Sequence, residues 1–194
     1  MKSILPRFGL KRALHQVAHL RLRAAVDPRR FRLAVNDALP HDVHVLSVRH
    51  VSDRFHARHD AVLRSYVYQI SRRRSAFLKP YVWWVREPLD LDRMRAAARA
   101  LTGFADFRAF ADDDPEEKST KVLIEDMTIA EDGDLVLVRV TGAHFLWKMV
   151  RRIVGVLVEV GRGGLDPADA GRLLLGDSGL PAKLTAPASG LFLE

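Results

Sequence analysis

One run of residues limits most strongly how this chain can fold: Phe145-Leu-Trp-Lys-Met-Val-Arg-Arg-Ile-Val-Gly155. Its apolar residues recur at helical spacing, which predicts a helix from about His144 to Gly161 that packs on a core. Lys148, Arg151 and Arg152 stand within it at i, i+3 and i+4, so we expect them on one face of the helix. Cations in such surroundings need an anionic partner. The alternative is that their long stems reach solvent and form surface ion pairs.

The charge and composition of the chain point to a globular protein with a polyanionic partner. The 194 residues are 48% apolar and 28% charged, with a net charge of +7. The absence of cysteine excludes disulfides, thiolate metal sites and a cysteine nucleophile, and fits a reducing compartment. No apolar segment approaches the roughly 20 residues needed to span a bilayer, and residues 1–12 lack the pattern of a signal peptide. We expect a cytoplasmic protein with no membrane partner.

Strand-like and helix-like periods alternate along the chain and predict an α+β fold with a mainly antiparallel sheet. The predicted helices span residues 29–38, 90–102, 144–161 and 166–175. The predicted strands span residues 43–51 and 62–70, together with a hairpin of residues 121–130 and 134–142 around a Glu-Asp-Gly turn. Residues 79–85 are predicted to be short, extended and aromatic.

Two tyrosines of the strand at 62–70, Tyr66 and Tyr68, fall on the same face of that strand. With an arginine just upstream they form a candidate platform on which a nucleobase could stack. The alternative is ordinary aromatic packing across strands.

Other polar groups carry weaker signals. His56 and His59 are spaced i, i+3, but they come without a third ligand at a recognised spacing, and the same holds for His15 and His19, so we expect no metal site. The run of arginines at 72–74 predicts a solvated turn, with contact to a phosphate as the alternative.

The order and spacing of several short motifs resemble those of the tRNA pseudouridine synthase A family, from about Ala13 to Leu193. The run at 145–155 is the most specific of them. The others are Asn36-Asp-Ala-Leu-Pro40, Phe55-His-Ala-Arg58, Ser65-Tyr-Val-Tyr68, Asp106-Phe-Arg-Ala-Phe110, Lys118-Ser-Thr120 and Gly190-Leu-Phe-Leu193.

The resemblance implies an enzyme that converts uridine to pseudouridine in the anticodon stem-loop of tRNA, without a metal or organic cofactor. It further implies a homodimer with two ferredoxin-like halves around a basic cleft. By motif position, the family's catalytic tyrosine and arginine correspond to Tyr66 and Arg151. Arg58 matches an arginine that lines the cleft, and Lys148 and Arg152 are expected to bind substrate beside it.

The chain departs from the family at the nucleophile. The family's aspartate lies in a Gly-Arg-Thr-Asp loop, and its position falls here at Phe8, within Pro6-Arg-Phe-Gly-Leu-Lys-Arg12. We therefore interpret residues 1–12 as a divergent N-terminal segment. Residues 13–194 correspond to the synthase catalytic domain, mainly its C-terminal half, with most of the N-terminal half missing.

Three hypotheses remain open at this point. The chain is a synthase by descent whose activity is impaired by the loss of the aspartate, a non-catalytic RNA-binding module, or a structural remnant that dimerises.

Overall fold

The computed structural model of the chain describes residues 12–13, 15–112, 119–176 and 178–194. These form two compact units. One is built from residues 62–194 with the described part of residues 1–16, and the other from residues 17–61. Phe8 and Lys118 lie outside the described residues.

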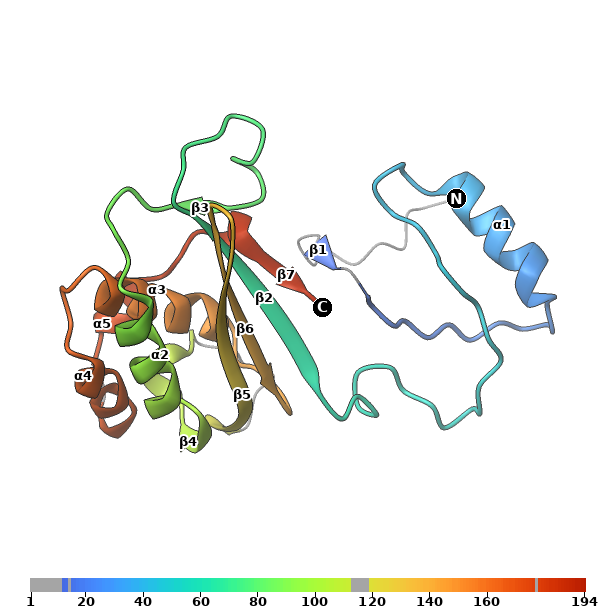
Figure 1. Ribbon diagram of the computed structural model, residues 1–194. Helices are drawn as coiled ribbons and strands as arrows, with labels where there is room; N and C mark the ends of the chain where they lie inside the picture. The colour runs from blue at the N-terminus through green and yellow to red at the C-terminus, as the bar shows by residue number, and fades with distance from the viewer. Residues whose placement is uncertain (1–11, 14, 113–118, 177) are drawn as a thin grey trace. The chain divides into compact units, whose positions relative to one another are not determined.

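A seven-stranded sheet forms the centre of the first unit (Figure 1). The strands follow the order β1-β7-β2-β6-β5-β4, with β3 beside β2. All pairings are antiparallel except β1 with β7 and β2 with β3. The predicted α+β fold with a mainly antiparallel sheet is therefore confirmed. The strands are β1 (Arg12–Ala13), β2 (Arg64–Ser71), β3 (Trp83–Trp84), β4 (Gly103–Asp106), β5 (Lys121–Asp132), β6 (Leu135–Gly142) and β7 (Leu191–Leu193).

Helices cover one face of this sheet (Figure 1). They are α2 (Leu91–Ala100), α3 (Met149–Gly161), α4 (Pro167–Arg172) and α5 (Leu180–Lys183), with short 3₁₀ turns at Arg108–Phe110, Leu173–Leu175 and Ala188–Gly190. The strands bury alternate residues towards the helices, for example Tyr66, Tyr68 and Ile70 of β2. Eleven of the 13 residues of α3 are buried, because this helix lies between the sheet and the outer helices.

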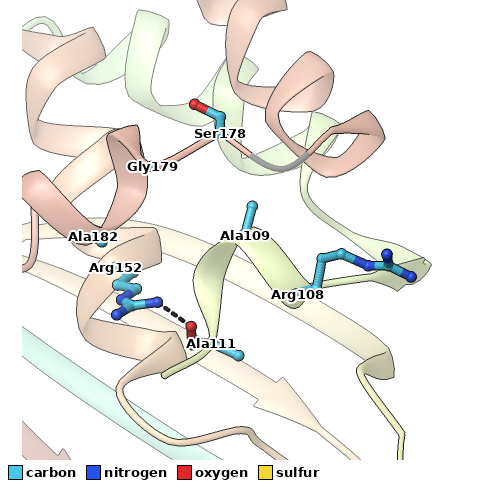
Figure 2. A pocket seen from close by; sticks show the side chains of 7 residues that line it. All are labelled: Arg108, Ala109, Ala111, Arg152, Ser178, Gly179 and Ala182. Atoms are coloured by element: carbon cyan, nitrogen blue, oxygen red, sulfur yellow. Dashed lines mark hydrogen bonds between the residues drawn. The ribbon is translucent and has the colours of Figure 1, made fainter. Parts of the chain in front are cut away.

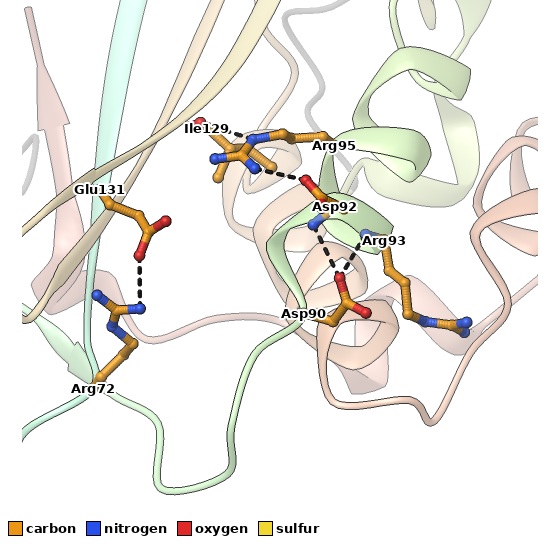
Figure 3. A network of polar contacts seen from close by, with 7 residues as sticks. All are labelled: Arg72, Asp90, Asp92, Arg93, Arg95, Ile129 and Glu131. Carbon is orange, nitrogen blue, oxygen red and sulfur yellow. Dashed lines mark hydrogen bonds and ion pairs between the residues drawn. The ribbon is translucent and has the colours of Figure 1, made fainter.

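Helix α2 begins and ends as its sequence predicts. The carboxylate of Asp90 accepts hydrogen bonds from the backbone N–H groups of Asp92 and Arg93, both at 3.0 Å (Figure 3). Arg95 pairs with Asp92 at 2.8 Å and also donates to the carbonyl of Ile129 on β5, which fastens the helix to the sheet (Figure 3).

Helix α3 starts later than its apolar period predicts. It ends at Gly161 as expected, but residues 144–148 are not helical. Lys148 has a left-handed backbone with φ of 61°, a conformation that cannot continue a right-handed helix. The predicted start at His144 was therefore wrong, and so was the placement of Lys148 on a helical face with Arg151 and Arg152.

The second unit contains one helix, α1 (Pro28–Ala38), close to the range predicted for it. The side chain of Asp27 caps its start by accepting a hydrogen bond from the backbone N–H of Arg30 at 2.7 Å. The prediction of a strand at 43–51 was wrong, because none of the strands in the described residues pairs with this segment. Its Val45 is instead held by the side chain of Asn36, which donates to Val45 O at 3.1 Å and accepts from Val45 N at 2.7 Å. Alternation of apolar and polar residues is not enough to form a strand where the backbone groups of the segment pair with a side chain instead of another strand.

Among the described residues no helix is both long enough and apolar enough to cross a membrane.

Candidate active site

Tyr66 lies on the face of β2 that packs against the helices, and its side chain is only 8% exposed. The edge of Phe145 meets its ring, with centroids 5.0 Å apart and an interplanar angle of 86°. Phe145 comes from the non-helical segment before α3. With 8% exposure and this ring contact, Tyr66 does not present an open ring face to a nucleobase in this structure.

Tyr68 is fully buried two residues further along the same face. Its hydroxyl donates to the carbonyl of Pro187 at 2.6 Å. Burial raises the pKa of Tyr68 above its ordinary value, and the positive charge of Arg151 acts in the opposite direction. Tyr68 is therefore a core residue that binds the backbone beside Arg151, and only Tyr66 remains a candidate to contact a base.

Arg151 leaves α3 towards the segment between α5 and β7. Its Nε donates to the carbonyl of Ala186 at 2.6 Å, and Ala186 N donates back to Arg151 O at 3.1 Å. The close approach depends on Gly155, because a Cβ there would lie 1.7 Å from the carbonyl oxygen of Leu184. No carboxylate among the described residues pairs with Arg151. Its positive charge is thus held in place without being neutralised.

Lys148 and Arg152 converge instead on Asp112. Lys148 Nζ lies 2.5 Å from Asp112 Oδ2, and Arg152 Nη2 lies 2.9 Å from Asp112 Oδ1. Arg152 also donates to the carbonyl of Ala111, as Figure 2 shows. The hydrogen bond from Lys148 is the main cause that lowers the pKa of Asp112. The three cations of the run at 145–155 are therefore divided between two partners rather than gathered on one face.

A cavity of about 260 Å³ borders Arg152. It is lined by Arg108, Ala109, Ala111, Arg152, Ser178, Gly179 and Ala182. The side chain of Arg108 points away from Arg152 (Figure 2) and pairs with Asp106 at 2.7 Å. Of the two arginines that line the cavity, Arg108 is thus paired with Asp106, and both outer nitrogens of Arg152 are already bonded.

Arg58 belongs to the second unit, in a turn shaped by histidines. The backbone N–H groups of Arg58 and His59 both approach His56 Nδ1 at 3.3 Å, and Ala57 N approaches His19 Nδ1 at 3.3 Å. The His56 ring lies 4.4 Å from that of His19 and 4.1 Å from that of His59. Within the described residues, no three histidine or acidic groups are arranged to hold a metal ion.

Comparison with known proteins identifies the relatives of this chain. A family profile described as tRNA pseudouridine synthase matches residues 97–194. A tRNA pseudouridine synthase A of Methylococcus capsulatus is 37% identical over 183 residues, which cover 93% of this chain and 68% of the relative. A tRNA pseudouridine synthase A 2 of Bacillus cereus is 35% identical over 94% of this chain and 75% of its own length. A tRNA pseudouridine synthase A of Thermotoga sp. is 41% identical over 82% of this chain and 66% of its own length. Because these relatives are more than 30% identical over most of the chain, and the α+β fold is the expected one, the chain belongs to the tRNA pseudouridine synthase A family.

Proposed function

We propose that this chain binds the anticodon stem-loop of tRNA and presents Tyr66 and Arg151 to a uridine that is converted to pseudouridine. The observation that supports this most directly is the arrangement of these two residues. Tyr66 shares its face of β2 with Tyr68, which binds Pro187 O, while Arg151 binds the adjacent carbonyl of Ala186. Both candidate catalytic residues are thus positioned from the same side of the sheet.

The isomerisation needs few protein groups and no redox partner. The C1′–N1 bond breaks, the uracil rotates, a C1′–C5 bond forms, and the proton on C5 leaves while N1 gains one. A carboxylate acts at the ribose, a cation orients that carboxylate, and an aromatic residue contacts the base and helps to move the C5 proton. We assign the cation to Arg151, whose charge is not neutralised, and the aromatic residue to Tyr66.

No residue of the chain is assigned to the role of the carboxylate. The family position falls at Phe8, and a phenyl ring can neither attack the ribose nor pair with Arg151. We propose that the chain binds tRNA but isomerises uridine only when a carboxylate is provided. A non-catalytic RNA-binding protein is the second candidate, and Phe8 is the observation that favours it.

Further features follow from the family and belong to the same proposal. Arg58, Lys148 and Arg152 would each bind phosphates of the substrate, and the chain would work as a homodimer in the cytoplasm. Because Lys148 and Arg152 share the single charge of Asp112, the trio keeps a net charge of +1 that a phosphate can use.

The test is tritium release from C5-labelled uridine in unmodified tRNA. We compare the unaltered chain with Phe8→Asp and with a fusion in which the N-terminal half of a family member, with its Arg-Thr-Asp loop, replaces residues 1–12. We expect no release from the unaltered chain and release from the fusion, abolished there by Arg151→Ala. Release by the unaltered chain near the rate of the fusion would contradict the role assigned to position 8. Failure of the fusion would contradict the assignment of the reaction.

A further inference from the structure

Residues 72–86, a loop that contains the short strand β3, follow β2 and carry a second basic and aromatic surface. Its sequence contains five basic residues and no acidic one. Phe77 is 90% exposed, Tyr81 47% and Trp84 40%. Single exposed apolar side chains are common on proteins and indicate nothing by themselves. Here, however, the exposed rings alternate with cations along one loop, which projects beyond the end of β2 (Figure 1).

The loop is ordered by hydrogen bonds rather than merely exposed. Tyr81 N and Val82 N donate to Leu78 O at 2.8 and 3.1 Å. Val82 is buried, and its carbonyl accepts from Ser189 Oγ at 3.0 Å. The exposure of Phe77 is therefore a property of a turn that is anchored on the core. Such a ring can bind a partner with little further loss of conformational freedom.

The first three arginines of the loop, Arg72, Arg73 and Arg74, differ in their partners. Arg72 pairs with Glu131 at 2.7 Å (Figure 3), and Arg73 pairs with Asp134 at 2.9 Å. Arg74 instead lies over the ring of Trp84, 5.3 Å from its centroid, and no carboxylate among the described residues pairs with it. Arg74 thus keeps a full positive charge directly beside an exposed aromatic face.

We propose that loop 72–86 binds unpaired RNA nucleotides, with a base stacked on Phe77 and a phosphate against Arg74. Proteins that bind single strands combine aromatic stacking surfaces with cations that follow the phosphates. Ser71 lies five steps along β2 from Tyr66, about 17 Å at the rise of a strand. The loop therefore contacts RNA away from the reacting uridine. The proposal rests on the proposed function only for tRNA as the natural ligand, and not on the isomerisation.

The experiment measures binding of two labelled RNAs to the full chain, an unstructured oligoadenylate and a fully paired hairpin. Phe77→Ala is compared with Phe104→Ala, since Phe104 is 70% exposed on β4, at the other side of the sheet. Arg74→Gln is compared with Arg99→Gln, an exposed arginine near the end of α2. Cross-linking to a thiouridine-substituted oligonucleotide locates the contact, because trypsin leaves Ser75–Arg86 as one peptide when it does not cleave before Pro80.

We expect Phe77→Ala to weaken oligoadenylate binding about tenfold and to abolish the cross-link to that peptide. Arg74→Gln should lower the salt slope of binding by about one. Binding of the hairpin RNA should be the same as in the parent chain. Both control variants should bind oligoadenylate as the parent chain does. Equal effects of Phe77→Ala and Phe104→Ala, or no effect of either, would overturn the proposal. So would a loop that binds phosphatidylglycerol-containing vesicles but not RNA. Since none of these measurements depends on tritium release, the proposal can fail or succeed separately from the proposed function.

Discussion

Asp112 holds Lys148 and Arg152 on its two carboxylate oxygens, at 2.5 and 2.9 Å. Lys148 precedes α3 in a left-handed conformation, whereas Arg152 is a buried residue of its first turn. One carboxylate thus fastens the turn before the helix to the helix itself. Arg151 lies between the two anchored positions.

Asp112→Asn should destabilise the protein, because it leaves the buried guanidinium of Arg152 without its counter-charge. Urea denaturation measures the change. Asp169→Asn is the matched control, since its carboxylate is equally exposed, 39%, but pairs with an arginine that is 75% exposed. The control should change stability by less than about 0.5 kcal/mol. Equal losses in the two variants would contradict the anchoring role.

Asp106 should give the protein a pH-dependent stability at acid pH. A hydrogen bond from Arg108 is the main cause that lowers its pKa from 3.8 to about 2. Because the folded pKa is the lower one, the stabilisation is present above pH 3.8 and is lost as the pH falls towards 2. Denaturation followed across this range should show a steeper acid decline for the parent chain than for Asp106→Asn. Parallel curves would contradict the prediction.

His56 should titrate below its ordinary value of 6.5, because desolvation and the neighbouring charges of His59 and His19 disfavour its protonated form. The backbone N–H groups of Arg58 and His59 also point at its Nδ1, and this nitrogen can accept hydrogen bonds only when it carries no proton, as in the neutral ring. The turn at 55–60 is therefore stabilised above pH 6.5, and this contribution is lost as the pH falls through the lower folded value. NMR titration of the imidazole protons measures it, with His56→Gln to assign the signal. A midpoint above 6.5 would show that the ring is stabilised in its charged form.

Gly155→Ala should cost roughly 1–3 kcal/mol or more, because the new methyl group collides with the backbone at Leu184 and neither α3 nor the segment can yield easily. It should also weaken tRNA binding through displacement of Arg151. Gly176→Ala is the control, since nothing lies within 4 Å of the added Cβ. Thermal denaturation and tRNA binding measured on the same preparations would separate the two effects. A stable Gly155→Ala variant would show that the contact is not as tight as described.

Arg151→Ala should weaken salt-sensitive tRNA binding more than Arg73→Ala, since Arg73 is already paired with Asp134. Filter binding at several salt concentrations gives both the affinity and the slope. Affinity that does not change with salt would contradict a phosphate contact.

Periodicity and turn chemistry predicted most of the first unit. Helix α2, the β5–β6 hairpin and the end of α3 follow from local signals that tertiary packing reinforces. The start of α3 could not be predicted, because a left-handed lysine carries no signature in sequence. The partners of Lys148, Arg151 and Arg152 could not be predicted from the sequence either. Asp112 lies far from Lys148 in the chain, and the partner of Arg151 is a carbonyl, which every residue possesses. The strand predicted at 43–51 does not form, because alternation of apolar and polar residues indicates which side chains share a face but not which strand would pair with the segment.

The hydrogen bond from Arg151 to Ala186 has a consequence for how this family can vary. The backbone carbonyl of residue 186 is present whatever side chain that residue carries. Substitutions at Ala186 that fit the space therefore keep the hydrogen-bond acceptor of Arg151. The orientation of the guanidinium depends instead on how closely two stretches of backbone approach, and therefore on the absence of a side chain at Gly155. We expect sequence drift around Ala186 to be tolerated, while position 155 admits no alternative residue.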